Sequence, residues 1–470
     1  GNLVDSSSLP QEYLDWCKAQ GYDCDAELSW IIYIDANSLY PTCMAMPLPI
    51  GDYQTGELPE PPDDRIKQAR DILNQYEDDD RTGYFIEVDF TIPEHLHDVF
   101  DYAPVSKRVV TRDQLSPLQH DIGELLGACK PTEKLVPFLG DQRKVLYHAG
   151  LLKFWVDKGV VITKVHNIWS FAQWPWMMEY IMGMARRRAE STDPIEREIL
   201  KKAMNSLYGK MLQDKTTQRN LSPFTCVQAF IRATSRDNCV DFNVMQLDSE
   251  PGVGFFGLVE TSKRNGPLLD MPRGAGMCIL DNSKLLMLRV HYDWFKFLIE
   301  LRACALMSDT DSFGYIVYCR SIMLEMLRST TVCFDLKEAI SPRDLLMLAG
   351  GDVEQANAWS EKLKADKGKL GALKLENMTS EIVEFCGLAA KMYSFKMIGH
   401  VDHEGNDKDD GITIDYVKGK GVPKRALEAN ASHQTYKDMI FKPSVNRVTF
   451  RTLRSNKHVV EQLQINRKML

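Results

Sequence analysis

Apolar and polar residues alternate along this chain in a way that predicts several short strands. Residues 30–41 begin with a buried strand that ends in an aspartate, and residues 83–90 form a second strand-like run. The proline- and acid-rich stretch 57–80 predicts an exposed excursion between them. Residues 303–318 predict a hairpin with acids at its tip, and residues 411–421 a strand that enters a glycine- and lysine-rich turn.

Helical spacing dominates other parts of the chain. Residues 137–171 mix apolar and polar positions at this spacing. Residues 174–209 extend the pattern as two helices joined at residues 191–194, which predicts a helical hairpin. Residues 284–301 and 345–367 predict two further helices.

Composition narrows the class of protein. The 470 residues are 44% hydrophobic with a net charge of -8, which excludes disordered and collagen-like chains and allows several domains or one large enzyme. No apolar run approaches the roughly 18 residues of a membrane span, and the start resembles no signal peptide, so we expect no membrane and an intracellular protein. The 11 cysteines include no CxxC pair and indicate reduced thiols more than a disulfide or zinc framework.

Charge is unevenly distributed. Residues 418–470 contain 12 lysines and arginines but only 3 acidic residues. Such a run is either a solvated face or tail, or a surface that binds phosphates.

Three acidic residues are candidates for metal chemistry. Asp35 ends the first strand, where a carboxylate is either a turn cap or a metal ligand. Asp309 and Asp311 lie two residues apart at the predicted hairpin tip. An exposed acidic turn is the simpler interpretation of that pair, but two adjacent carboxylates also suit a divalent ion such as Mg²⁺.

A stripe of polar residues marks the second helix of the predicted hairpin. Lys201, Asn205 and Tyr208 are spaced to lie on one helical face, which suits contact with a triphosphate, a sugar and a base. Three arginines, 186–188, on the preceding helix add positive charge. A solvated basic patch is the alternative.

The order of these segments is more specific than any one of them. DANSLYP (35–41), KKAMNSLYG (201–209) and DTDS (309–312) resemble motifs A, B and C of family-B DNA polymerases, and SLYP resembles the protein-primed branch. Further blocks, including EFCGLAAKMYSFKM (384–397) and YVKGKGVPK (416–424), resemble the Polinton/Maverick polymerases of transposons and related viruses. The resemblance extends from about Trp30 to the C-terminus.

This resemblance implies an α+β, right-hand polymerase fold. It has a palm of antiparallel sheet plus helices, helical-hairpin fingers, a small thumb and two insertions. The expected units are a lead-in (1–29), palm with motif A (30–51), palm continuation and first insertion (52–164), fingers (165–215), second insertion (216–282), palm with motif C and a Lys-x-Tyr element (283–424), and thumb (425–470).

The resemblance also implies catalytic roles in DNA-directed DNA synthesis. Asp35 and Asp311 would bridge two Mg²⁺ ions, replaceable by Mn²⁺, with Asp309 as an outer ligand and the Ala36 carbonyl completing one ion. Tyr40 would exclude a ribose 2′-hydroxyl. The nucleotide-binding set is Ser38, Leu39, Tyr40, Arg187, Lys201, Asn205, Tyr208 and Gly209, and the DNA-binding set is Lys391, Tyr393, Lys418 and Lys420.

Expected partners are primer-template DNA, dNTPs and a terminal priming protein, with the chain as a monomer. A nuclear or viral replication compartment is expected for a eukaryotic element, and the cytoplasm otherwise. Only about 30 residues precede motif A, so we expect the polymerase portion without an exonuclease domain. Two alternatives remain: an inactive polymerase-like DNA-binding protein and a primer-synthesising nucleotidyltransferase.

Overall fold

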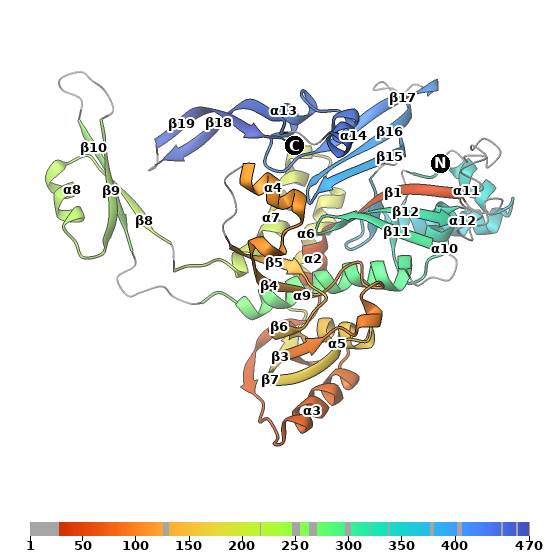
Figure 1. The fold of residues 1–470 in the computed structure, drawn as a ribbon, viewed down its shortest axis with the longest axis horizontal. Coiled ribbons are helices and arrows are strands. Elements are labelled where there is room, and N and C mark those ends of the chain that lie inside the picture. The colour runs from red at the N-terminus through yellow and green to blue at the C-terminus, as the bar shows by residue number, and fades with distance from the viewer. Residues whose placement is uncertain are drawn as a thin grey trace.

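The chain forms an α+β structure with mainly antiparallel sheets, as the resemblance implied (Figure 1). It is known from a computed structural model. The structure describes residues 28–125, 131–216, 218–246, 254–262, 270–296, 302–319, 321–336, 339–376, 380–401, 407–442, 445–456 and 459–469.

The largest sheet contains the predicted strands that carry the acids. Ile32 and Ile34 of β1 are buried in one core with Tyr315 and Val317 of the neighbouring β12. The hairpin predicted for 303–318 and the strand predicted for 411–421 are both confirmed. The strand order is β11 (Arg302–Ser308), β12 (Ser312–Cys319), β1 (Leu28–Ala36), β15 (Ser380–Ala389), β16 (Met392–Val401) and β17 (Asp407–Lys418), while β14 (Leu373–Leu375) pairs with β1 and β13 (Phe334–Asp335).

A second sheet replaces much of the helix predicted for 137–171. Only α5 (Ala149–Asp157) is helical there, between β6 (Gln142–His148) and β7 (Val161–Trp174). Register shifts interrupt the pairing of β7 with β3 (Thr82–Thr91), and each shift changes which side chains face the core. Buried residues of β7 therefore recur every three positions and imitate a helix: Ile162, Val165, Ile168 and Phe171.

The excursion predicted for 57–80 is also wrong in part, because it contains a packed helix. In α3 (Pro62–Gln75), Ala69 and Leu73 are buried in a core shared with Ile86 of β3. The same sheet ends in β2 (Leu48–Thr55), beside β7. A separate two-stranded ribbon consists of β4 (Val105–Val110) and β5 (Thr132–Pro137), with α4 (Pro117–Leu125) between them in sequence.

The predicted helical hairpin is confirmed as α6 (Met178–Glu190) and α7 (Pro194–Met211). The Asp193 carboxylate accepts a hydrogen bond from the Ile195 N–H, so it caps α7. Ile181, Met204 and Met211 anchor the hairpin in the core beneath the large sheet.

A small unit follows the hairpin and stands apart from the rest of the chain (Figure 1). Its sheet has the order β8 (Asn220–Phe224), β10 (Phe255–Thr261), β9 (Cys239–Gln246), and α8 (Val227–Thr234) packs on it through Phe230. The next helix, α9 (Arg273–Arg289), contributes to both larger cores, and the boundary expected at residue 282 falls inside it.

Two further helix predictions need correction. The helix predicted for 284–301 begins earlier, as α9, and continues as a π-helical segment, Val290–Lys296. The helix predicted for 345–367 is two helices, because Gly350 and Gly351 have positive φ angles of 65° and 89° that end the first. The helices are α11 (Pro342–Leu348) and α12 (Val353–Asp366), after α10 (Ile322–Arg328).

The basic C-terminal residues form α13 (Lys424–Glu428), α14 (His433–Phe441) and the hairpin β18 (Arg447–Asn456) and β19 (Val459–Lys468). This unit packs on β17 through a small core that contains Val417, Leu427 and Tyr436. No helix in the described part of the chain is long and apolar enough to span a membrane.

Candidate active site

The turn after β1 is held by backbone hydrogen bonds from two distant segments. The Ala36 N–H donates to the Asp311 carbonyl at 2.7 Å, and the Asn37 N–H donates to the Ala372 carbonyl at 2.9 Å. Ser38 then adopts a left-handed conformation with φ 53°, and α2 (Leu39–Met44) begins. These bonds fix Asp35 at the end of its strand.

The tip of the β11–β12 hairpin brings the other acids to the same place. Asp35 pairs with Ser312 in the strand register, so Asp311 lies across from the end of β1. The Asp311 N–H donates to the Asp309 carbonyl at 2.7 Å, and Thr310 between them has a φ of 65°. The tight turn therefore brings Asp309 and Asp311 to the end of the strand that carries Asp35.

Burial and mutual repulsion make these carboxyl groups hard to ionise. Burial, followed by the charge of Asp311, raises the pKa of Asp35 to about 7. Burial, followed by the charge of Asp309, likewise raises the pKa of Asp311. A positive charge at this point would stabilise the ionised pair.

Lys201 on α7 supplies part of that charge. Its ammonium group lowers the pKa of both Asp35 and Asp311, against the effect of burial. The structure therefore brings the predicted lysine of the helical stripe to the predicted acids.

The same helix meets α2 through two tyrosines. The rings of Tyr40 and Tyr208 are stacked, with centroids 4.3 Å apart and planes 8° from parallel. Asn205 is exposed on α7, and Gly209 has no atom within 4 Å of where a side chain would begin. Packing within the described structure does not require glycine at position 209.

The predicted DNA-binding residues are in different environments. Lys391 forms an ion pair with Asp309 at 2.6 Å, so it lies at the acidic tip. Tyr393 is buried, 2% exposed, among rings that include Phe385 and Tyr416. Lys418 and Lys420 are exposed where β17 leads into the C-terminal unit.

The Arg187 side chain forms an ion pair within the helical hairpin. Its guanidinium donates to the Glu196 carboxylate at 2.7 and 2.9 Å, and Ser191 donates to the same carboxylate at 2.8 Å. This arginine is therefore engaged with α7, and within the described part of the chain it forms no ion pair with Asp35 or Asp311.

Three residues near the acids were missed from the sequence. Lys374 of β14 pairs with Asp35 in the strand register and lowers its pKa, while Glu376 raises it. The Asp335 carboxylate accepts a hydrogen bond from the Asn37 amide at 3.0 Å. These contacts join segments about 300 residues apart, and no local pattern marks them.

The carboxylates near Asp35 suit divalent ions, but by themselves they do not form a complete metal-binding site. Among the described residues, no three His, Cys, Asp or Glu side chains form a ready-made metal cluster. Two carboxylates with raised pKa values are nevertheless a suitable pair for Mg²⁺, since a hard cation removes the repulsion between them. The third, Asp309, is held by Lys391.

Comparison with known proteins places this geometry in context. Residues 24–219 match a family model described as DNA polymerase type B, organellar and viral. That part of the chain is similar to type B DNA polymerases. It includes Asp35, Tyr40, Lys201 and Tyr208 but ends before the β11–β12 hairpin.

Solved structures of phi29 DNA polymerase are similar at low identity. The ternary complex with primer-template DNA and incoming nucleotides has 14% identity and a TM-score of 0.48, and the binary complex with primer-template DNA has 13% and 0.47. Both alignments cover 94% of this chain, which spans only 58% of each phi29 chain. A search of curated proteins found no match.

Proposed function

We propose that this chain is the polymerase portion of a DNA-directed DNA polymerase. The observation that carries the proposal is the register of β1 against β12, which sets Asp35 beside Asp311 with Lys201 acting on both. The match of residues 24–219 to type B DNA polymerases supports the same reaction. The chain would add deoxynucleotides to a primer 3′-hydroxyl.

Two Mg²⁺ ions, or Mn²⁺ in their place, would be held by Asp35, Asp311 and the Ala36 carbonyl, with Asp309 as an outer ligand. When bound, such ions activate the hydroxyl and neutralise the triphosphate. The protein's own contribution would be to position two carboxylates that are costly to ionise without a cation, so ion binding would be coupled to the loss of their protons.

The helical hairpin would bind the nucleotide. Lys201 would neutralise the phosphates, with the backbone of Ser38 and Leu39 beside them. Tyr40 would block a ribose 2′-hydroxyl, and Tyr208, stacked on it, would support the base with Asn205 and Gly209. Arg187 must exchange Glu196 for a phosphate before it can contribute.

The remaining contacts would hold primer-template DNA. Lys391, Lys418, Lys420 and the C-terminal unit supply exposed positive charge, whereas Tyr393 would act by supporting the strand that follows Lys391. On this proposal the large sheet is the palm, α6–α7 the fingers and 425–470 the thumb.

The resemblance to protein-primed polymerases supports a finer proposal. The enzyme would replicate a selfish element or virus of Polinton/Maverick type as a monomer and would accept a terminal protein as primer. The unit formed by β8–β10 and α8 would then contribute to processivity.

Extension of a labelled primer with Mg²⁺ and dNTPs tests the proposal. Asp35→Asn and Asp311→Asn keep side-chain size and remove one carboxylate each, and we expect each to lower the rate about 100-fold or more. Asp79→Asn, at an exposed position after α3, is the matched control and should retain full activity. Primer-template binding should survive in all three variants.

The two alternatives give different results in the same assay. An inactive binding protein would bind primer-template but extend nothing, even without substitutions. A primer-synthesising enzyme would make product from single-stranded template alone and would accept rNTPs. Extension that persists in Asp35→Asn and Asp311→Asn would refute the assignment of these acids.

A further inference from the structure

A basic cavity of about 490 Å³ lies between β4 and β6 and shares no residue with the candidate active site. Four basic residues line it, Lys107, Arg108, Arg143 and Lys144, against one acidic residue, Asp141. The volume is within the range of about 300–1,000 Å³ that small-molecule sites occupy. The cavity is thus large enough for more than a single inorganic ion.

The positive charge is only partly neutralised within the protein. Lys107 pairs with Glu133 at 2.7 Å. Arg108, in contrast, lies opposite Lys134 in the β4–β5 register, an arrangement of like charges that is unfavourable without an anion nearby. Its guanidinium rests 3.7 Å from the centre of the Phe138 ring, which orients it.

Two buried side-chain oxygens beside the cavity have no hydrogen-bond partner among the described residues. Ser106 is 8% exposed and Gln142 is 1% exposed. The Ser106 Oγ and the Gln142 Oε1 make no hydrogen bond to any residue that the structure describes. The Gln142 amide nitrogen donates to the Phe138 carbonyl at 2.8 Å, so its oxygen remains as an acceptor. Both oxygens are shielded from solvent, so a ligand in the cavity would reach them only after their side chains turn. Buried polar atoms without a partner are uncommon and costly, which favours such a rearrangement when a ligand binds.

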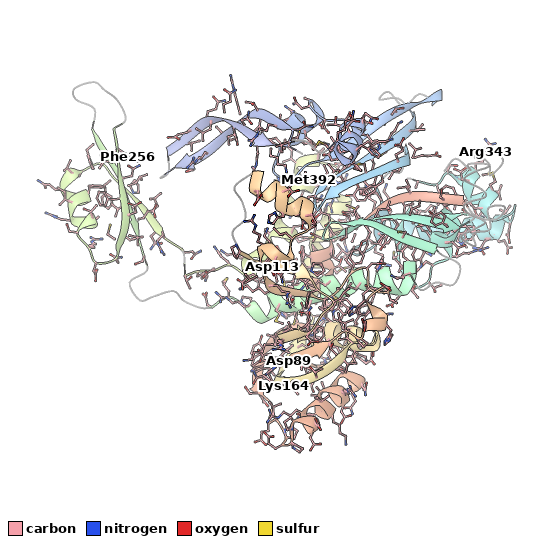
Figure 2. The ribbon with its side chains drawn as sticks, viewed as in Figure 1. Asp89, Asp113, Lys164, Phe256, Arg343 and Met392 are labelled. Atoms are coloured by element: carbon pink, nitrogen blue, oxygen red, sulfur yellow. The ribbon has the colours of Figure 1, made fainter. Side chains whose placement is uncertain are left out.

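The wall of the cavity is also held in place. The backbone of Lys144 has a φ of 49°, and its N–H donates to the Asp89 carboxylate at 2.7 Å. Asp89 lies on β3 beside Lys164 of β7 (Figure 2). A Cβ at Gly140 would lie 2.6 Å from the Phe138 ring, so glycine allows that ring to support Arg108. Lys144 is therefore held on the four-stranded sheet, while the Phe138 ring orients Arg108 on the β4–β5 ribbon.

We propose that this cavity is a second nucleotide-binding site, which holds the phosphate of a nucleotide that is either free or part of a nucleic-acid strand. Arg108, Arg143 and Lys144 would pair with the phosphate, and the Ser106 hydroxyl would donate to it. The Gln142 oxygen requires a donor, which a bare phosphate diester lacks but a sugar hydroxyl or a base amino group provides. The inference does not depend on the proposed polymerase activity.

Binding without metal tests the site. A short fluorescein-labelled DNA strand is titrated in EDTA with competition by inorganic phosphate or deoxyadenosine monophosphate. The double variant Arg143→Gln, Lys144→Gln should raise Kd at least about tenfold, since charge-assisted bonds of this kind exceed 1.4 kcal/mol together. Ser106→Ala should raise Kd several-fold without lowering Tm.

The matched control removes two basic residues from elsewhere on the surface. Lys67 and Arg70 are exposed on α3, so Lys67→Gln, Arg70→Gln changes net charge equally and should leave Kd unchanged. Competition by deoxyadenosine monophosphate that depends on Arg143 and Lys144 identifies a free nucleotide. If the double variant weakens binding of the strand but deoxyadenosine monophosphate does not compete, the site binds a phosphate of the strand. Either result supports the site.

Equal Kd values for the cavity and control variants would overturn the inference. So would loss of binding in Lys201→Ala alone, because that would place the ligand in the candidate active site. Primer extension is measured separately, so an inactive enzyme that still binds through Arg143 and Lys144 would refute the proposed function and leave this site standing.

Discussion

A substitution at Gly209 should change stability and nucleotide binding in opposite directions. It lies within α7, and an added methyl group would meet no atom within 4 Å. Alanine is favoured over glycine in a helix by up to about 1 kcal/mol. Gly209→Ala should therefore stabilise the free protein slightly and raise Tm.

The same methyl group should obstruct the proposed nucleotide site, because it would stand next to Tyr208. If it displaces the incoming nucleotide at a cost of about 1.4 kcal/mol, kcat/KM falls about tenfold. Single-nucleotide incorporation at saturating primer-template measures this value. We expect a raised KM for dNTP, together with the raised Tm.

Gly183 on α6 provides the control. A methyl group there also meets no atom within 4 Å, so Gly183→Ala should raise Tm to a similar extent and leave kcat/KM unchanged. Unchanged kcat/KM in Gly209→Ala would remove this residue from the nucleotide site. An equal loss in both variants would instead mean that stiffening the hairpin slows the enzyme.

Three further predictions concern two residues of the site, Tyr40 and Lys391, and the buried His291 of the π-helical segment Val290–Lys296. Tyr40→Ala should admit rNTPs in single-nucleotide incorporation, since the ring is the proposed barrier to a 2′-hydroxyl, and an unchanged sugar preference would contradict that role. Lys391→Ala should release Asp309 and weaken primer-template binding several-fold in a fluorescence titration, whereas an unchanged Kd would limit Lys391 to holding the acid. Burial lowers the pKa of His291 from 6.5 to about 4. As pH falls, this histidine therefore binds a proton in the unfolded chain before it does so in the folded protein. About 3 kcal/mol of the free energy of unfolding should be lost between pH 6.5 and pH 4. Urea unfolding of the wild type and His291→Gln measures this loss, and parallel pH profiles would exclude it.

Local patterns predicted those parts of the site that are continuous in sequence. Strand β1 with Asp35, the hairpin with Asp309 and Asp311, and the helix with Lys201 were each recognisable from spacing. The assignment of motifs came from the order of these segments and from resemblance. What brings them together is strand pairing, which is non-local.

Features created by tertiary contacts escaped prediction. The short β14 strand sets Lys374 across from Asp35, and three residues carry too little pattern to reveal a strand. Strand β7 imitated a helix because register shifts alter which side chains are buried. Charge alone suggested that Arg187 was available, whereas Glu196 on the neighbouring helix already binds it.

The α6–α7 hairpin is buried at its base and exposed at its far end, so it can tilt about the base. Met204 and Met211 are buried at its base, while Ile195 and Ile199, toward the far end, are 70% and 60% exposed. Ten residues of helix separate Pro194 from Met204, about 15 Å, so tilting α7 by about 20° would carry its tip about 5 Å. Small rearrangements around the methionines would therefore be amplified at the arginines, with little change where Tyr208 meets Tyr40.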